Sequence, residues 1–242
     1  MNLNLRILLA AFACVFQAAG NDYLSPNTPG VTPSPGGSPF TVWGVSNFRY
    51  QQLYGASDFG TSPMLISSFA FAQNTIFSIP IDVTCPNIAI YMSTSQRTPD
   101  LGMSTTFADN IGPDNTLVLS GSLHFFSAGP GFGCRVQLQH PFLYNPLAGN
   151  LLLDIFNYQP IGKPAIGDYA VNVQAAVPDT VSHIEGTTSA QVGFLSGAGI
   201  ITAFHADPVP EPSLICASFI SLALFLFYNF RTLARREGAA RK

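Results

Sequence analysis

The sequence is poor in charge and especially poor in basic residues across its central part. Charged residues make up 10% of the 242 positions. Between Asn21 and Asp207, four basic residues stand against eleven acidic ones, a formal charge of −7. Nucleic-acid recognition depends on clustered Lys and Arg that neutralise phosphates. We therefore expect no nucleic-acid partner.

Local catalytic motifs are also missing. The segment 193–197 places its serine at the wrong spacing for a nucleophile elbow. The four histidines lie far apart in the sequence and show no paired spacing of the kind that binds zinc. Glu185 is the only glutamate of the central part. We expect the protein not to be an enzyme.

A helical period of 3.6 residues is absent outside two apolar terminal segments, whereas short alternating stretches recur between turn signals. Residues 40–207 are therefore predicted to form one all-β ectodomain of about ten strands, a two-sheet sandwich or jelly roll. Residues 94–115 are its expected long connection. The predicted strands are Thr41–Val45, Leu65–Ala72, Thr75–Thr84, Asn87–Ser93, Thr116–Ser127, Cys134–His140, Asn150–Asn157, Tyr169–Ala176, Val181–Ile184, Gln191–Leu195 and Ile200–His205.

The first 39 residues divide into two segments. Residues 1–20 have one charge, Arg6, then the apolar run Ile7–Phe16 and small residues at the end, which is typical of a secretory signal peptide. Residues 21–39 are rich in proline and glycine and have few large apolar side chains. They are predicted to form a linker without a core of their own.

The last 35 residues, 208–242, combine three features in a fixed order. Pro210, Glu211 and Pro212 come first, followed by the uncharged apolar run Leu214–Phe230 and an arginine-rich tail. A helix of this run would cover roughly 25 Å, the short end of what spans a bilayer. The basic tail predicts a single transmembrane helix with its end in the cytoplasm and the ectodomain outside.

This order resembles the PEP-CTERM sorting signal of exported bacterial proteins. The resemblance implies that exosortase, a membrane-embedded processing enzyme, recognises the Pro210–Pro212 motif and removes the helix. It further implies release to, or attachment at, the cell surface, often where exopolysaccharide is made. An ordinary single-span anchor with a proline-containing stalk is the alternative. The segments Arg49–Tyr54 and Gly149–Asp154 also look like segments that recur in proteins with this signal, but they bring no known activity.

Two pairs of residues are candidate sites in the ectodomain. Cys85 and Cys134 are its only cysteines, and in an oxidising compartment an even number predicts a disulfide. Two buried free thiols are the alternative. Asp109 and Asp114 offer oxygen ligands for calcium, although Asx turns explain them equally well.

The ectodomain also has aromatic residues that could stack on sugar rings, although most of the 20 phenylalanines are expected in the core. The rings that we single out for this role are Trp43, Tyr50, Tyr54, Phe59, Tyr91 and Tyr158.

Three functional hypotheses follow from the sequence. The first is a structural or adhesive protein of the cell surface or extracellular matrix, sorted through its C-terminal signal. The second is a module that binds extracellular polysaccharide. A secreted hydrolase ranks third, because glycoside hydrolysis needs two suitably spaced acids and no local motif supplies them.

Overall fold

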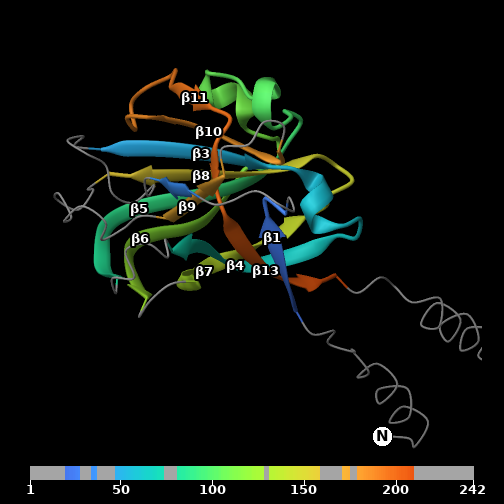
Figure 1. Ribbon diagram of the computed structural model, residues 1–242, viewed down its shortest axis with the longest axis horizontal. Coiled ribbons are helices and arrows are strands. Elements are labelled where there is room, and N and C mark those ends of the chain that lie inside the picture. The colour runs from blue at the N-terminus through green and yellow to red at the C-terminus, as the bar shows by residue number, and fades with distance from the viewer. Residues whose placement is uncertain are drawn as a thin grey trace, which may run out of the picture. The chain divides into compact units, whose positions relative to one another are not determined.

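Two antiparallel β-sheets make up the described part of the chain, which is otherwise almost without helices (Figure 1). The structure is a computed structural model, and it describes residues 20–27, 34–36, 47–73, 81–127, 131–158, 171–174 and 179–209. These belong to one unit, Ala19–Val209. The expected all-β sandwich is confirmed.

The first sheet has the strand order β1-β13-β4-β9-β12, with β2 paired to β9 and β7 paired to β4. Its strands are β1 (Asn21–Ser25), β2 (Ser34–Gly36), β4 (Met64–Gln73), β7 (Gly131–Tyr144), β9 (Val171–Gln174), β12 (Gly199–Ile200) and β13 (Thr202–Pro208). Asn21 is paired with Ala206, so the start of β1 lies beside the end of β13.

The second sheet has the strand order β11-β10-β3-β8-β5-β6. Its strands are β3 (Phe48–Tyr54), β5 (Ile81–Ser95), β6 (Thr116–Ser127), β8 (Asn150–Asn157), β10 (Val181–Gly186) and β11 (Phe194–Ser196). Three short 3₁₀ helices complete the fold: η1 (Ala56–Phe59), η2 (Asp100–Gly102) and η3 (Phe107–Asn110). The last two lie in the connection 96–115, which we call the cover segment; it lies beside β10 and β11 in Figure 1.

The main core lies between the two sheets and combines aromatic rings with aliphatic side chains. Phe204 on β13 makes ring contacts with Tyr54 on β3, at 4.9 Å between centroids, and with Phe59, at 5.3 Å. Phe59 also meets Tyr144 on β7 edge to face, at 5.2 Å. All four rings are fully buried. Such ring pairs stabilise a core beyond the area that they bury.

Two strands were predicted with their observed bounds. Thr116–Ser127 and Asn150–Asn157 are strands with the predicted bounds. The structure has one long strand, β5, where two were predicted, Thr75–Thr84 and Asn87–Ser93. Residues 74–80 lie outside the described part. The strand predicted at Thr41–Val45 lies wholly outside it.

The linker prediction for residues 21–39 needs correction. Asn21–Ser25 is β1, hydrogen-bonded to β13, and Ser34–Gly36 is β2, paired with β9. An edge strand lacks a partner on one side, so a segment with many prolines can still pair on the other. The linker composition thus concealed two sheet strands.

The predicted signal peptide and the apolar run Leu214–Phe230 lie outside the described residues. Among the residues that are described, no helix is long and apolar enough to cross a membrane.

Candidate functional site

Two neighbouring glutamines on β3 point to opposite faces of the second sheet. Gln52 points into the main core, where its amide accepts from the backbone N–H of Ile200 and donates to the Ile200 carbonyl, each at 2.8 Å. Its oxygen also accepts from the hydroxyl of Tyr50, at 2.5 Å. Because Ile200 belongs to the first sheet, Gln52 joins the two sheets through a fully buried polar contact.

An arginine–aspartate pair occupies the outer face of the same sheet. Arg49 on β3 donates to both carboxylate oxygens of Asp154 on β8, at 3.0 and 2.6 Å. The side chains are 11% and 3% exposed. Gln51 donates to Asp154 as well, at 2.8 Å. Such a bidentate geometry with extra donors is the arrangement that offsets the desolvation of a buried ion pair.

The guanidinium of Arg49 lies between two aromatic rings. Its carbon is 4.4 Å from the ring centroid of Phe107 in the cover segment and 4.3 Å from that of Phe156 on β8. Arginine is suited to this position because its planar group stacks on rings while its edge binds a carboxylate. Arg49 therefore connects the sheet to the segment that covers it.

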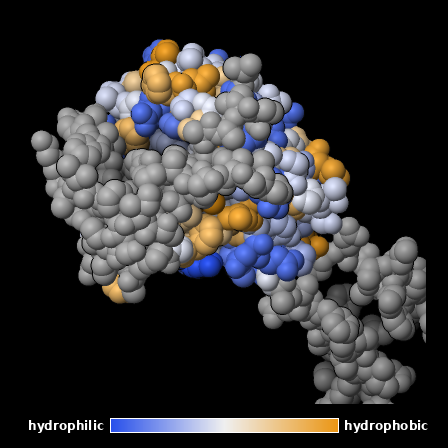
Figure 2. Space-filling view, viewed as in Figure 1, coloured by the Kyte–Doolittle hydropathy of each residue, from blue (hydrophilic) through white to orange (hydrophobic). Residues whose placement is uncertain are grey.

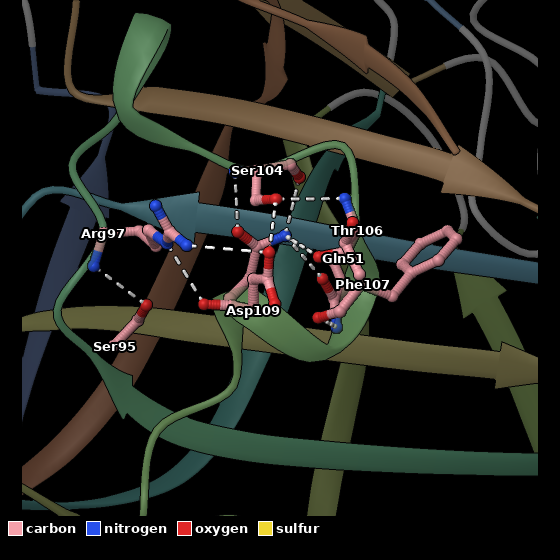
Figure 3. Close-up of polar contacts among 8 residues, drawn as sticks. Gln51, Ser95, Arg97, Ser104, Thr106, Phe107 and Asp109 are labelled. Carbon is pink, nitrogen blue, oxygen red and sulfur yellow. Dashed lines mark hydrogen bonds and ion pairs between the residues drawn. The ribbon is translucent and has the colours of Figure 1, made fainter. Parts of the chain in front are cut away.

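Polar contacts hold the cover segment in place (Figure 3). The side chain of Asn110 accepts from the backbone N–H of Ser104, at 2.8 Å, and donates to the side chain of Gln51, at 3.1 Å. Gln51 also donates to the backbone carbonyl of Phe107, at 3.2 Å. The cover segment is thus tied to β3 by side chains that are themselves buried.

A second, smaller apolar cluster lies beneath this cover. This outer-face cluster joins residues of the sheet to two residues of the cover segment; its members are Leu53, Met103, Phe107, Leu152 and Ile184. Gly193 closes it, because a Cβ at that position would lie 2.8 Å from the Phe107 ring and 2.5 Å from a backbone oxygen. The outer face of the sheet is therefore packed at this end, not open to solvent.

Beyond the cover, three aromatic rings continue the outer face. Phe156 and Tyr158 are nearly parallel, with centroids 6.0 Å apart and 17° between the planes. Tyr91 on β5 meets Phe156 edge to face, at 5.8 Å. Tyr158 is 41% exposed. We call Tyr91, Phe156 and Tyr158 the aromatic platform.

Charged groups border the aromatic platform. Partial burial raises the pKa of Tyr158, the nearby Tyr91 and the carboxylate of Asp154 raise it further, and Arg49 opposes the rise. An exposed ring such as that of Tyr158 is an element of a site that stacks on sugars or other flat ligands.

The rings singled out from the sequence divide between core and surface. Tyr50, Tyr54 and Phe59 are buried in the main core and cannot stack on a ligand. Trp43 lies outside the described residues. Tyr91 and Tyr158 are brought together on the outer face, and the structure adds Phe156 between them.

The two aspartates considered for calcium have protein partners in different places. Asp109 accepts from the hydroxyl of Ser104, at 3.0 Å, and lies 3.7 Å from the guanidinium of Arg97. Asp114 accepts from the backbone N–H of Thr94, at 2.6 Å. Within the described part of the chain, no group of three or more His, Cys, Asp or Glu side chains is placed to hold a metal ion.

The predicted disulfide is not formed in this structure, where Cys85 is a free and buried thiol. Burial raises its pKa to about 12, so it is an unreactive core residue. Cys85 is paired with Leu123 in the second sheet, whereas Cys134 is paired with Phe71 in the first.

Three carboxylates meet where η1, η2 and β10 approach one another. Asp58 accepts from the hydroxyls of Ser25 and Thr180, at 2.5 and 2.6 Å. Asp100 accepts from the backbone N–H of Asp179, at 3.2 Å. One buried oxygen of Asp100 and one of Asp179 have no hydrogen-bond partner among the described residues. Burial, together with the charges of Asp100 and Asp58, raises the pKa of Asp179 to about 6.

The processing motif Pro210, Glu211 and Pro212 lies outside the described residues. Sequence reasoning missed the pairing of Arg49 with Asp154, which are 105 positions apart. A signal was present, since Arg49–Tyr54 and Gly149–Asp154 had been singled out as recurring segments, and the structure pairs them side by side in β3 and β8.

Comparison of the chain with protein-family models, with curated proteins and with solved structures gave no match. A function is therefore proposed from the order of the sequence segments, together with the fold and the outer-face geometry.

Proposed function

We propose that this chain is an exported protein with a structural or adhesive role at the cell surface or in the extracellular matrix. In this proposal a PEP-CTERM signal sorts it, and an exosortase processes it from the inner membrane. The observation that carries the proposal is the order of its parts. A secretory signal precedes the sandwich, and the Pro210–Pro212 motif, the apolar run and the arginine-rich tail follow it.

The boundary of the fold supports this order. The last strand, β13, ends at Pro208, two residues before the motif begins. Its pairing with β1 and β4 is complete without any residue of the motif. The motif therefore follows the last described strand, and its two prolines disfavour helix.

Replacement of Glu211 tests the sorting proposal. Expressed in an exosortase-bearing host, a Glu211→Ala chain should stay in the membrane fraction at full length, whereas the unchanged protein should reach the surface in a shorter form. Asp207→Ala, an acid-to-alanine change just before the motif, is the matched control and should be processed normally. Equal processing of both variants would contradict the proposal.

A second candidate function is binding of extracellular polysaccharide, and the aromatic platform favours it. Tyr158 presents an exposed ring nearly parallel to Phe156. Sugar rings stack on such a ring through their apolar faces. An adhesive protein needs a contact surface of this kind.

Titration of the full chain in detergent with the host's exopolysaccharide tests the second candidate. If Tyr158 stacks on a sugar ring, Tyr158→Ala should weaken binding about fivefold, the equivalent of about 1 kcal/mol. Phe126→Ala removes an exposed ring from the far end of β6 and should leave binding unchanged. Equal effects of the two changes would exclude the platform as the binding surface.

A further inference from the structure

Several exposed apolar side chains gather at the end of the first sheet where β13 finishes. Leu65 on β4 is paired with Leu143 on β7, and the next strand places Asp207 beside Leu65. Leu65 and Leu143 are both exposed, the latter at 59%. We call Leu65, Leu143, Leu147 and Val209 the exit patch.

The other two members extend the patch on either side. Val209 follows β13 directly and donates its backbone N–H to the carbonyl of Pro63, at 3.2 Å. Leu147 lies in the turn after β7 and is 74% exposed. Figure 2 shows apolar surface on this side of the molecule, near the end of β13 and the β7–β8 turn of Figure 1.

Isolated surface leucines are ordinary, but the place of these residues is informative. Asn21 is paired with Ala206, so both ends of the described chain leave the sheet at this edge. Neighbouring strands lie about 4.8 Å apart, which puts Leu143 roughly 10 Å from β13. The exit patch therefore surrounds the point of departure toward the C-terminal segment.

Sequence spacing fixes how far this edge can be from the apolar run. Leu214 follows Val209 by five residues, and five extended residues span at most about 17 Å. The polar interface of a bilayer is itself roughly 5–8 Å deep on each side. If Leu214–Phe230 spans the membrane, Val209 lies at most about 17 Å from the hydrocarbon boundary, which is near enough for the exit patch to reach the lipid headgroups.

We infer that the exit patch rests on the lipid interface while the protein is still anchored. This inference rests on the proposed membrane anchor and adds the surface of the sandwich that touches the lipid. The four positions include no basic residue, and the acidic Asp207 lies beside Leu65. Contact is therefore made by apolar side chains at the headgroup boundary, not by attraction to anionic lipid.

Fluorescence quenching by lipids tests this orientation. Trp43 is the only tryptophan, so a Trp43→Phe chain that keeps its β-sheet circular dichroism serves as the background. Into it, Leu143→Trp and Leu147→Trp each place one probe in the exit patch. Phe126→Trp places one at the far end of β6, where the native ring is also exposed. Each full chain is reconstituted into phosphatidylcholine vesicles with and without bromine on the lipid acyl chains.

Vesicle flotation separates the two proposals. If the chain floats, brominated lipid should remove roughly half of the emission at positions 143 and 147 and little at 126, since only the patch lies within the interfacial depth. Flotation with equally weak quenching at all three positions would overturn the orientation and leave the anchor intact. A chain that does not float would overturn the anchor and, with it, this inference.

Discussion

The two apolar clusters of this protein differ in how they are held together. The main core between the sheets consists of many large rings and aliphatic side chains contributed by both sheets. The outer-face cluster has five buried members and depends on the ion pair of Arg49 and Asp154 and on the amide of Gln51 to hold its cover. The first should determine global stability, and the second the position of one segment.

Loss of a central ring in each cluster should give the largest effects and separate them. Phe204→Ala removes a ring that meets Tyr54, Phe59 and Phe69. We expect it to lower the free energy of unfolding by about 4 kcal/mol. Phe107→Ala should cost less and should mainly increase hydrogen exchange in residues 96–115. If Phe107→Ala increased hydrogen exchange equally in both sheets and in residues 96–115, the distinction between the clusters would be wrong.

The ion pair is the next test. Asp154→Ala leaves the guanidinium of Arg49 buried without its carboxylate, and we expect a loss of about 3 kcal/mol in urea unfolding. The double change Arg49→Met with Asp154→Leu removes both charges and should recover most of that loss. A double variant as unstable as the single one would show that the pair does more than hold the cover.

Gln52 tests the polar contact that crosses the main core. Gln52→Leu leaves the backbone N–H of Ile200 without its side-chain acceptor, while the Ile200 carbonyl still accepts from the hydroxyl of Thr202. The change should cost about 2 kcal/mol. Gln137→Leu is the control, because Gln137 is exposed and donates to a backbone carbonyl only. Its cost should stay within about 0.5 kcal/mol. Similar costs for both changes would show that the crossing contact contributes little.

The carboxylate cluster gives the smallest expected change in stability. Asp179 has a pKa of about 6 in the fold, against about 3.9 unfolded. The folded state then binds more protons between these values, so stability should fall as pH rises from about 4 to about 6. Asp179→Asn keeps an acceptor for Val181 and removes this slope. With solvent screening considered, we expect a gain of about 1 kcal/mol at pH 7.

The exposed Asp207, changed to Asn, is the control for this titration and should leave the pH profile unaltered. A slope that persists in Asp179→Asn would assign the titration to another group.

Different parts of the structure were predictable to different degrees, for physical reasons. β8 was predicted because its two faces could be distinguished along the chain. β3 was missed because the polar sequence from Arg49 to Gln52 does not look buried, although most of the strand is. Each of its polar side chains is paired with a group distant in sequence, as Arg49 is with Asp154. Periodicity cannot indicate such partners, because they depend on which strands become neighbours.

The C-terminal segment and the outer face of the second sheet also differ in what the sequence alone can indicate. The proposed sorting rests on the order of residues 208–242, which can be recognised without any knowledge of the fold. The proposed binding surface rests on Phe156 and Tyr158, which only the sheet register brings together with Tyr91. In these proposals a local sequence encodes the destination, and the sheet topology forms the contact surface.

Intact-mass analysis of the surface-exposed protein from an exosortase-bearing host tests the central proposal most directly. The account predicts a mature chain that begins after the signal peptide, at about Asn21, and lacks the apolar run Leu214–Phe230 together with the arginine-rich tail. A surface form whose mass requires every residue through Lys242 would contradict it.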